Sequence, residues 1–283
     1  MTPLRHKMIE SMRRRGLSVR TQQSYVRAVA DLARYHGRSP DALEPCQVDA
    51  YFRHLVVERE LSPASCRLAL NAVRYLYLKV LERERFDVEV AIPKVPQRIP
   101  ELLTREEVAR ILRACGNDKH RTALTVTYGC GLRVSETVAL RVGDIDGERA
   151  LAHVVLGKGG KDRMVLLSPS VLAALRAYWR VFRPVRWLFP GRHPTRALEC
   201  SSLQRAYTVA KGRAGVEKVG GIHALRHAYA THQLEQGLPV HVLQRLLGHG
   251  SLRTTLRYVH WVPSYRDGGA HHGDLVAALG AGR

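Results

Sequence analysis

Several features that define other protein classes are missing from this sequence of 283 residues. It contains no run of about 18 apolar residues, which a membrane-spanning helix would require. The N-terminal stretch MTPLRHKMIESMRRRG also lacks the apolar centre of a signal peptide. We therefore expect a cytoplasmic protein that has no membrane partner.

Cysteine is scarce, and the spacing of the cysteines indicates neither disulfide bonds nor metal binding. The five cysteines are an odd number and form no CxxC pair, so neither a disulfide framework nor a zinc site is predicted. We expect them to be reduced core residues: Cys46, Cys66, Cys115, Cys130 and Cys200. His223 and His227 have the spacing of the HExxH zinc motif, but the glutamate is absent and an arginine lies between them. The sequence predicts no metal and no cofactor.

Acidic residues are also in the minority. There are 45 Lys and Arg residues against 25 Asp and Glu residues, which gives a formal net charge of +20. The surplus is found on both sides of residue 100, so it is not confined to one basic tail. In a soluble protein, this positive charge indicates that the binding partner is nucleic acid rather than a membrane surface. Biased codon usage together with solubility is the alternative explanation.

The first part of the chain has a helical pattern. Apolar residues between Val48 and Val56 repeat at helical spacing, and Ser62 followed by Pro63 is typical of a helix start. We predict three or four short helices over residues 1–90. Residues 91–101, AIPKVPQRIPE, contain three prolines and no period, which indicates an extended connector.

A second domain is expected over residues 102–283. Thr104 and Glu107 form a T-x-x-E capping box that predicts a helix start, and a further helix is expected to carry Leu132, Arg133 and Glu136. The extended runs 151–157 and 163–168 flank a glycine-rich segment and predict a hairpin. Helical patterns follow from Ser170, so the predicted fold is mainly α with a small antiparallel sheet.

Four segments of the second domain carry residues suited to chemistry, although each is weak evidence alone. An Arg and a Glu three residues apart are more often a surface ion pair, and a Gly-Lys-Gly tip is usually a solvated turn. The segments are Gly131–Glu136, Gly157–Arg163, His223–His227, and the stretch from Leu247 through His249 to His260.

Taken together, the four segments contain every group needed to cleave a phosphodiester without a metal. Arg133 and Arg226 can fork onto the phosphate, and Tyr258 can form a covalent phosphoester. Because an unperturbed tyrosine has a pKa of about 10, we expect the cationic pocket to assist its ionisation. His223 is the expected base or transition-state donor. Lys158 is expected to protonate the leaving 5′ oxygen, and His249 to donate to a phosphate oxygen.

These residues and their order resemble the tyrosine recombinases, the family that includes phage integrases, Xer-type recombinases and integron integrases. The resemblance extends over nearly the whole chain, through the segments GLRVSE, GKGGKDR, HALRHAYATHQLEQG, LLGH and TTLRYVH. It indicates Lys158 rather than Lys161 as the family lysine, and it gives Glu136 the role of holding Arg133. The family pattern falls on Arg133, Lys158, His223, Arg226, His249 and Tyr258.

The resemblance implies an N-terminal core-binding domain and a C-terminal catalytic domain that together clamp double-stranded DNA. It further implies cleavage through a 3′-phosphotyrosyl link without metal or ATP, by four protomers in a homotetramer or heterotetramer. A Xer-like or mobile-element recombinase associated with the nucleoid is favoured over an integron integrase. The apolar stretch 275–279 could dock on a neighbouring protomer or be a frayed tail.

Two other functions remain open on sequence grounds. A type IB topoisomerase would use the same cleavage chemistry without exchanging strands. A DNA-binding regulator that retains the fold is the other alternative, but it would not need to keep Arg133, Arg226 and Tyr258.

Overall fold

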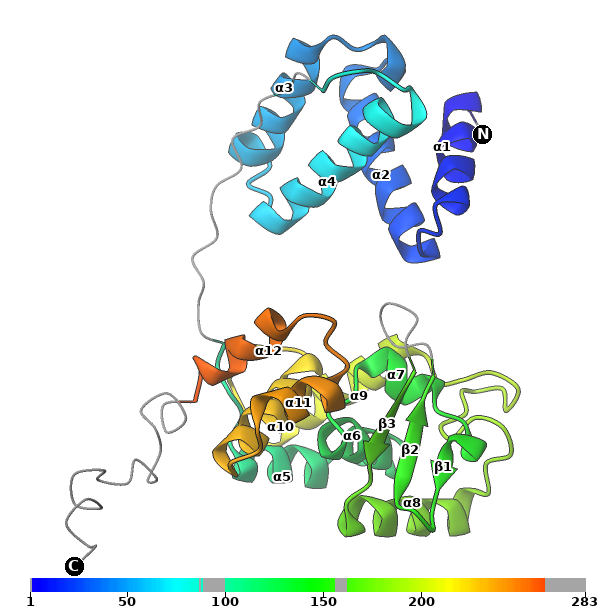
Figure 1. Cartoon of the computed structure of the whole chain (residues 1–283), viewed down its shortest axis with the longest axis vertical. Helices are drawn as coiled ribbons and strands as arrows, with labels where there is room; N and C mark the ends of the chain where they lie inside the picture. Colours follow the sequence, from blue (N-terminus) through cyan, green and yellow to red (C-terminus); the bar gives the residue numbers. More distant parts are fainter. Residues whose placement is uncertain (1, 87, 89–99, 156–161, 263–283) are drawn as a thin grey trace, which may run out of the picture. The chain divides into compact units, whose positions relative to one another are not determined.

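The computed structural model of the chain describes residues 2–86, 88, 100–155 and 162–262. Its contacts divide the chain into two compact units, Met1–Arg98 and Ile99–Arg283, and each unit has a buried core of its own (Figure 1). The division falls within the connector predicted over residues 91–101, most of which lies outside the described residues. No helix of the described ranges is both long and apolar enough to cross a membrane.

The first unit is entirely helical in its described part, as predicted. Ser62 caps the fourth helix by accepting a hydrogen bond from the Ser65 amide, and Pro63 is its first residue. Helices α2 and α4 pack against each other over the core. The helices are α1 (Pro3–Arg14), α2 (Val19–His36), α3 (Pro45–Arg53) and α4 (Pro63–Tyr75), with the 3-10 turn η1 (Pro40–Ala42) and the π-helical segments η2 (His54–Glu58) and η3 (Leu76–Val80), which directly follow α3 and α4.

The second unit contains most of the helices and a small sheet, which confirms the predicted fold class. Its helix α5 starts at the predicted capping box, where the side chains of Thr104 and Glu107 each accept a hydrogen bond from the other's backbone amide. The helices are α5 (Arg105–Ala114), α6 (Asp118–Gly129), α7 (Val134–Ala139), α8 (Pro169–Phe182), α9 (Cys200–Arg213), α10 (His223–Glu235), α11 (Val240–Leu247) and α12 (Leu252–Val259), with the 3-10 turn η4 (Val142–Asp144).

The sheet has three antiparallel strands in the order β1 (Ile145–Asp146), β2 (Leu151–Val154) and β3 (Arg163–Leu166). The predicted hairpin corresponds to β2 and β3, which pair Leu151 with Leu166 and Val154 with Arg163. Strand β1 was not predicted, because two residues carry no alternating pattern. The hairpin tip at residues 156–161 lies outside the described residues, and so does the stretch 275–279.

The packing of the second unit brings distant segments together. Helix α6 contacts α7, α8, α9 and α10, while α11 contacts β3, α10 and α12 (Figure 1). A separate apolar cluster joins α10, α11 and α12 and includes Leu247 and Tyr258. The start of α7, the start of β3, one face of α10 and the end of α11 are thereby placed around one site.

The cysteines depart in part from the expectation of core residues. Cys66, Cys115 and Cys130 are buried, but Cys46 is exposed and Cys200 is half-buried. Cys46 lies in the first turn of α3 and Cys200 in the first turn of α9, where a side chain can face solvent. No group of three or more His, Cys, Asp or Glu residues suited to a metal ion occurs within the described ranges.

Candidate active site

Arg133 occupies the position just before helix α7, which begins at Val134, so Leu132 and Arg133 lie outside the helix that was expected to carry them with Glu136. Glu136, in the first turn, accepts hydrogen bonds from the Arg133 amide at 2.9 Å and from Arg133 Nη1 at 2.6 Å. The same carboxylate therefore caps the helix and fixes the guanidinium. This is the contact that the resemblance implied.

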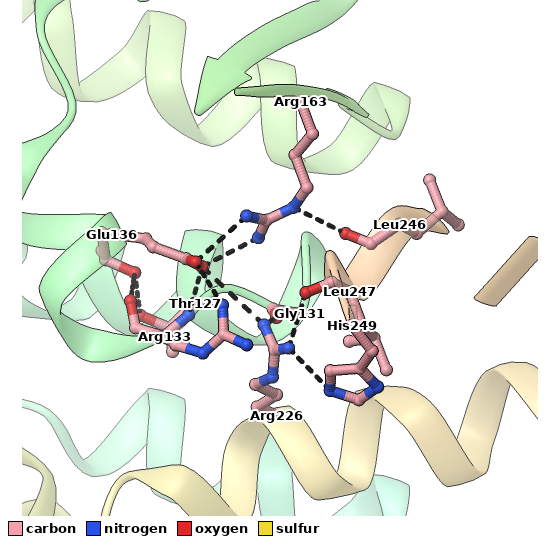
Figure 2. A network of polar contacts seen from close by, with 10 residues as sticks. Thr127, Gly131, Arg133, Glu136, Arg163, Arg226, Leu246, Leu247 and His249 are labelled. Atoms are coloured by element: carbon pink, nitrogen blue, oxygen red, sulfur yellow. Dashed lines mark hydrogen bonds and ion pairs between the residues drawn. The ribbon is translucent and has the colours of Figure 1, made fainter. Parts of the chain in front are cut away.

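Glu136 also holds two further guanidinium groups, which the sequence did not predict (Figure 2). Arg163 makes a bidentate contact through Nη1 at 3.0 Å and Nη2 at 2.8 Å, and Arg226 Nη1 lies 3.7 Å from Oε2. Burial alone would raise the pKa of Glu136, but hydrogen bonds from Arg163 and Arg133 and the charges of both lower it to about 2. The carboxylate is thus ionised and shared by three cations.

We expect Glu136→Gln to lower the free energy of unfolding by about 3 kcal/mol at pH 7, the equivalent of moving its pKa from 4.5 to about 2. Because the folded-state pKa is depressed, this stability is present above the unfolded pKa and is lost as the pH falls from about 4.5 toward 2. Urea denaturation of both proteins should show their difference shrinking over that range. A difference that is independent of pH would contradict the assignment.

Arg226 is the most completely enclosed of the three cations, with 1% of its surface exposed. Its Nη1 donates to the Gly131 carbonyl and its Nη2 to the Leu247 carbonyl, both at 2.7 Å. Arg163 Nε donates to the Leu246 carbonyl at 2.9 Å (Figure 2). The last carbonyls of α11, which have no partner within the helix, are thus satisfied by two guanidinium groups. Burial and the charge of Arg133 lower the pKa of Arg226 to about 10, so it remains cationic at neutral pH.

Two glycines in the left-handed region allow these close approaches. Gly131 has φ +60°, and a Cβ there would lie 2.3 Å from the Tyr229 ring. Gly248, directly after α11, has φ +63°, and a Cβ there would lie 3.0 Å from Arg163 Cδ. Any larger residue would be strained in conformation and would displace a side chain of the site.

His249 is oriented by two hydrogen bonds. Its Nε2 lies 3.0 Å from Arg226 Nη2, and its Nδ1 lies 2.9 Å from Thr255 Oγ1. Because arginine can only donate, Nε2 accepts, and the ring proton is on Nδ1. Burial and the charge of Arg226 lower the pKa of His249 to about 4, so the ring is neutral. The donation to phosphate expected from the sequence would therefore need a change of protonation or orientation.

Tyr258 lies on α12 and is 4% exposed. Its hydroxyl lies 3.1 Å from His227 Nδ1, its ring packs edge-on to Trp261, and its plane is parallel to His249 at 6.1 Å. Burial raises the pKa of the phenol, while Arg226 opposes this through its charge and a side-chain hydrogen bond. The expected assistance from the cations is present, but burial outweighs it and the phenol is protonated.

The structure gathers most of the predicted set. Arg133 and Arg226 meet through Glu136, His249 contacts Arg226, and Tyr258 packs beside His249. The ring of His223 lies 4.6 Å from that of His227, and burial and the charge of Arg226 lower the pKa of His223. Lys158 lies outside the described residues.

Sequence reasoning missed two residues of this site, Arg163 and His227. Arg163 ends the glycine-rich segment that contains Lys158, and its position as the first residue of the returning strand was the available signal. His227 lies four residues after His223 and therefore on the same helix face. That spacing suggests a metal motif, and it gives no sign of a contact with Tyr258.

Comparisons with known proteins match both units of the chain to phage integrase models. The phage integrase family matches residues 101–264, and the phage integrase N-terminal SAM-like domain matches residues 4–86. The Sinorhizobium fredii protein named "Putative integrase/recombinase y4qK" is 42% identical over 92% of this chain and 84% of its own length. The tyrosine recombinase XerD of Caulobacter vibrioides is 34% identical over 87% of each chain.

Solved structures show the same fold. The crystal structure of XerA recombinase superposes with a TM-score of 0.55 at 26% identity, over 99% of this chain and 98% of that one. The XerH site-specific recombinase bound to a palindromic difH substrate gives a TM-score of 0.71 at 21% identity, over 90% and 80%.

The chain therefore belongs to the phage integrase family. It is an enzyme of the tyrosine recombinase class, which carries out site-specific recombination, and the relatives favour this function over the topoisomerase alternative.

Proposed function

We propose that this chain cleaves and rejoins duplex DNA by transferring a phosphodiester onto Tyr258. The phenolic oxygen forms a bond to phosphorus, the bond from phosphorus to the 5′ oxygen breaks, and a 3′-phosphotyrosyl link with a free 5′ hydroxyl results. Attack by that hydroxyl, or by one from a second DNA site, reverses the step. The bond energy is kept in the link, so rejoining requires no nucleotide.

One observation carries this proposal: the phenol of Tyr258 lies beside a buried guanidinium that is held in place without DNA. His249 connects the two, because its Nε2 lies 3.0 Å from Arg226 Nη2 while its ring is parallel to that of Tyr258 at 6.1 Å, and Arg226 shares Glu136 with Arg133. A phosphate that contacted both arginines would have the phenolic oxygen close to its phosphorus. Preorganised donors of this kind stabilise the developing charge without reorganisation.

We assign roles to the remaining residues on chemical grounds. Lys158 would protonate the leaving 5′ oxygen, and His223 would donate to a non-bridging oxygen. His249 would do the same once its ring is protonated or reoriented beside the phosphate. The partner is double-stranded DNA, bound by residues 1–90 and 102–283 on either side of the connector 91–101. Four protomers, of this chain alone or with a second recombinase, would exchange strands between two DNA sites in the nucleoid.

Covalent capture tests this proposal and identifies the recognition sequence in the same experiment. The protein is incubated with a pool of nicked duplexes of randomised sequence, in which the short fragment diffuses away after cleavage and prevents rejoining. Complexes that resist detergent denaturation are recovered, and the attached strand is sequenced. We expect enrichment of a defined sequence. If the pool is bound but no covalent complex forms, the proposal is wrong.

Strand exchange separates the proposal from a topoisomerase. A supercoiled plasmid that carries two copies of the recovered sequence should yield recombinant circles. The same plasmid without these copies should stay supercoiled. Efficient relaxation of the second plasmid without recombinants from the first would instead indicate a topoisomerase.

The helix α1 carries exposed cations suited to phosphate contact. Neutralising Arg13 and Arg14, together with the adjacent Arg15, should weaken DNA binding and lower the slope of log affinity against log salt by about 0.9 for each phosphate that is no longer neutralised. Titrations at several salt concentrations measure that slope. Arg53→Gln is the control for loss of a helix arginine that pairs with a carboxylate, because Arg53 pairs with Asp49 at 3.3 Å much as Arg14 pairs with Glu10 at 3.6 Å. We expect it to change the slope less than the triple variant does. An unchanged slope in the α1 variant would exclude these arginines from the DNA interface.

A further inference from the structure

A histidine that the family pattern does not include contacts the nucleophilic oxygen directly. His227 follows Arg226 on α10, and its Nδ1 lies 3.1 Å from the hydroxyl oxygen of Tyr258. The two rings are 5.6 Å apart. His223, one turn earlier, contacts the ring of His227 at 4.6 Å. The contacts therefore run from the Tyr258 hydroxyl to His227 and from His227 to His223, and of the two histidines it is His227 that contacts the hydroxyl.

The chemistry of the neighbours sets the direction of this hydrogen bond. The positive charge of Arg226 lowers the pKa of Tyr258, and it favours the phenolic oxygen rather than the phenolic proton on the side that faces it. The phenolic hydroxyl has a single proton to donate, and among the described residues its hydrogen-bond partner is His227 Nδ1, so we place the proton toward His227. His227 Nδ1 is then the acceptor, and its ring proton is on Nε2.

We infer that His227 is the base that accepts the phenolic proton of Tyr258 when its oxygen attacks phosphorus, and that it returns this proton when the strand is rejoined. This inference rests on the proposed function and deepens it. It moves the role of base from His223, where the sequence pattern places it, to the next turn of the same helix.

The proton and electron balance of the step is complete. The O–H bond of Tyr258 breaks and its electron pair forms the bond to phosphorus, while the proton passes to His227 Nδ1. The bond between phosphorus and the 5′ oxygen breaks, and that oxygen takes a different proton, for which Lys158 is the proposed source. His227 is left as an imidazolium with one proton on each nitrogen, ready to protonate Tyr258 when the link is reversed.

The groups around His227 explain why transfer requires bound DNA. Burial and the neighbours His223 and Arg226 lower the pKa of His227 to about 4, while burial raises the pKa of the phenol, so the pair is neutral without DNA. Tyr258 faces His227 from α12, and the Trp261 ring, 5.5 Å away, adds no charge. A phosphate anion beside Arg226 offsets the cation that suppresses protonation of His227. Bond formation to phosphorus also acidifies the phenol.

His227→Asn tests the proton transfer, because an asparagine can place an oxygen close to the position of Nδ1 and accept the hydrogen bond, yet it cannot take the proton. Single-turnover formation of the covalent complex is measured from pH 6 to 9 on a sequence recovered from the nicked pool. We expect the variant to bind that DNA and to be slower by about 10²- to 10⁴-fold, the usual contribution of a general base. Its rate should rise about tenfold per pH unit as hydroxide takes over, whereas the wild-type rate levels off.

The chain offers a matched control for the removal of a buried histidine. His232, also on α10, makes an equivalent contact between its Nδ1 and the Tyr128 hydroxyl at 2.9 Å, away from the cation cluster. His232→Asn should cost comparable stability and leave the pH profile of cleavage unchanged. If His227→Asn cleaves at the wild-type rate, or slows without any change in its pH profile, the inference is wrong.

A measurement without DNA keeps this test separate from the recombinase proposal. Nitrogen NMR of the wild-type protein at pH 7 reports which imidazole nitrogen of His227 carries the proton. We expect Nδ1 to be unprotonated, with a shift that changes in Tyr258→Phe. A proton on Nδ1 would overturn the role of His227 even if covalent complexes form. Absence of covalent complexes in the wild type would instead overturn the proposed function.

Discussion

Tyr258→Phe is expected to abolish covalent attachment to DNA while leaving DNA binding intact. Phenylalanine keeps the ring that packs against Trp261 and lies parallel to His249, so the surroundings of the site should persist. The variant loses the one oxygen that can form the phosphoester, together with a hydrogen bond to His227 worth about 1 kcal/mol. Detergent-resistant complexes on the nicked duplex and mobility shifts on the intact duplex measure the two properties.

Tyr128→Phe is the appropriate comparison for this variant. Tyr128 is also hydrogen-bonded to a histidine of α10, His232, at 2.9 Å, but the other nitrogen of His232 contacts the Leu103 carbonyl rather than the cation cluster. We expect Tyr128→Phe to form covalent complexes at close to the wild-type rate. Complexes that persist in Tyr258→Phe would show that another residue attacks the phosphate.

Arg226→Ala should reduce the rate of cleavage by about 10²- to 10³-fold, the effect of removing one preorganised donor, and should reduce DNA affinity far less. The guanidinium is held by the carbonyls of Gly131 and Leu247, so it can meet a phosphate without reorganising. Single-turnover cleavage at saturating protein separates this effect from binding. Arg226→Lys keeps the positive charge but loses the planar pair of guanidinium donors. We expect its cleavage rate to lie between those of the wild type and Arg226→Ala.

Because Arg226 is buried, its removal also destabilises the protein, and a control for that destabilisation is needed. Arg163→Ala removes a cation from the same carboxylate, Glu136, and frees the Leu246 carbonyl in the same helix end. We expect a similar fall in the free energy of unfolding with a smaller fall in cleavage. Equal reductions of cleavage in the two variants would indicate that Arg226 acts only through the fold.

Local chemistry explains which parts of the fold the sequence could predict. The start of α4 at Ser62 and Pro63 and the start of α5 at Thr104 and Glu107 depend on residues within one helical turn, and both were predicted correctly. Strand β1, with two residues, depends on pairing with β2 and has no pattern of its own. Leu132 and Arg133 were wrongly placed inside the helix that carries Glu136, because an arginine is compatible with a helix interior, whereas here Arg133 is the residue before the first helical turn.

The site shows the same limit at longer range. The family resemblance connected Glu136 with Arg133, three residues away, whereas the contact of Glu136 with Arg163 spans 27 residues and that of Arg226 with Gly131 spans 95. The contact between His227 and Tyr258 depends on how α10 packs against α12. Which nitrogen or oxygen a side chain meets at such separations is decided by packing, which no spacing rule in the sequence encodes.

The three arginines that share Glu136 carry two net positive charges into a pocket that largely excludes water. A phosphodiester in its ground state brings one negative charge, but the five-coordinate phosphorus formed during attack brings two. The charge of the cluster is therefore fully neutralised only in the transition state. The cluster binds that state more tightly than it binds intact DNA. A protein built in this way can release an uncut duplex readily and still favour the reaction once attack begins.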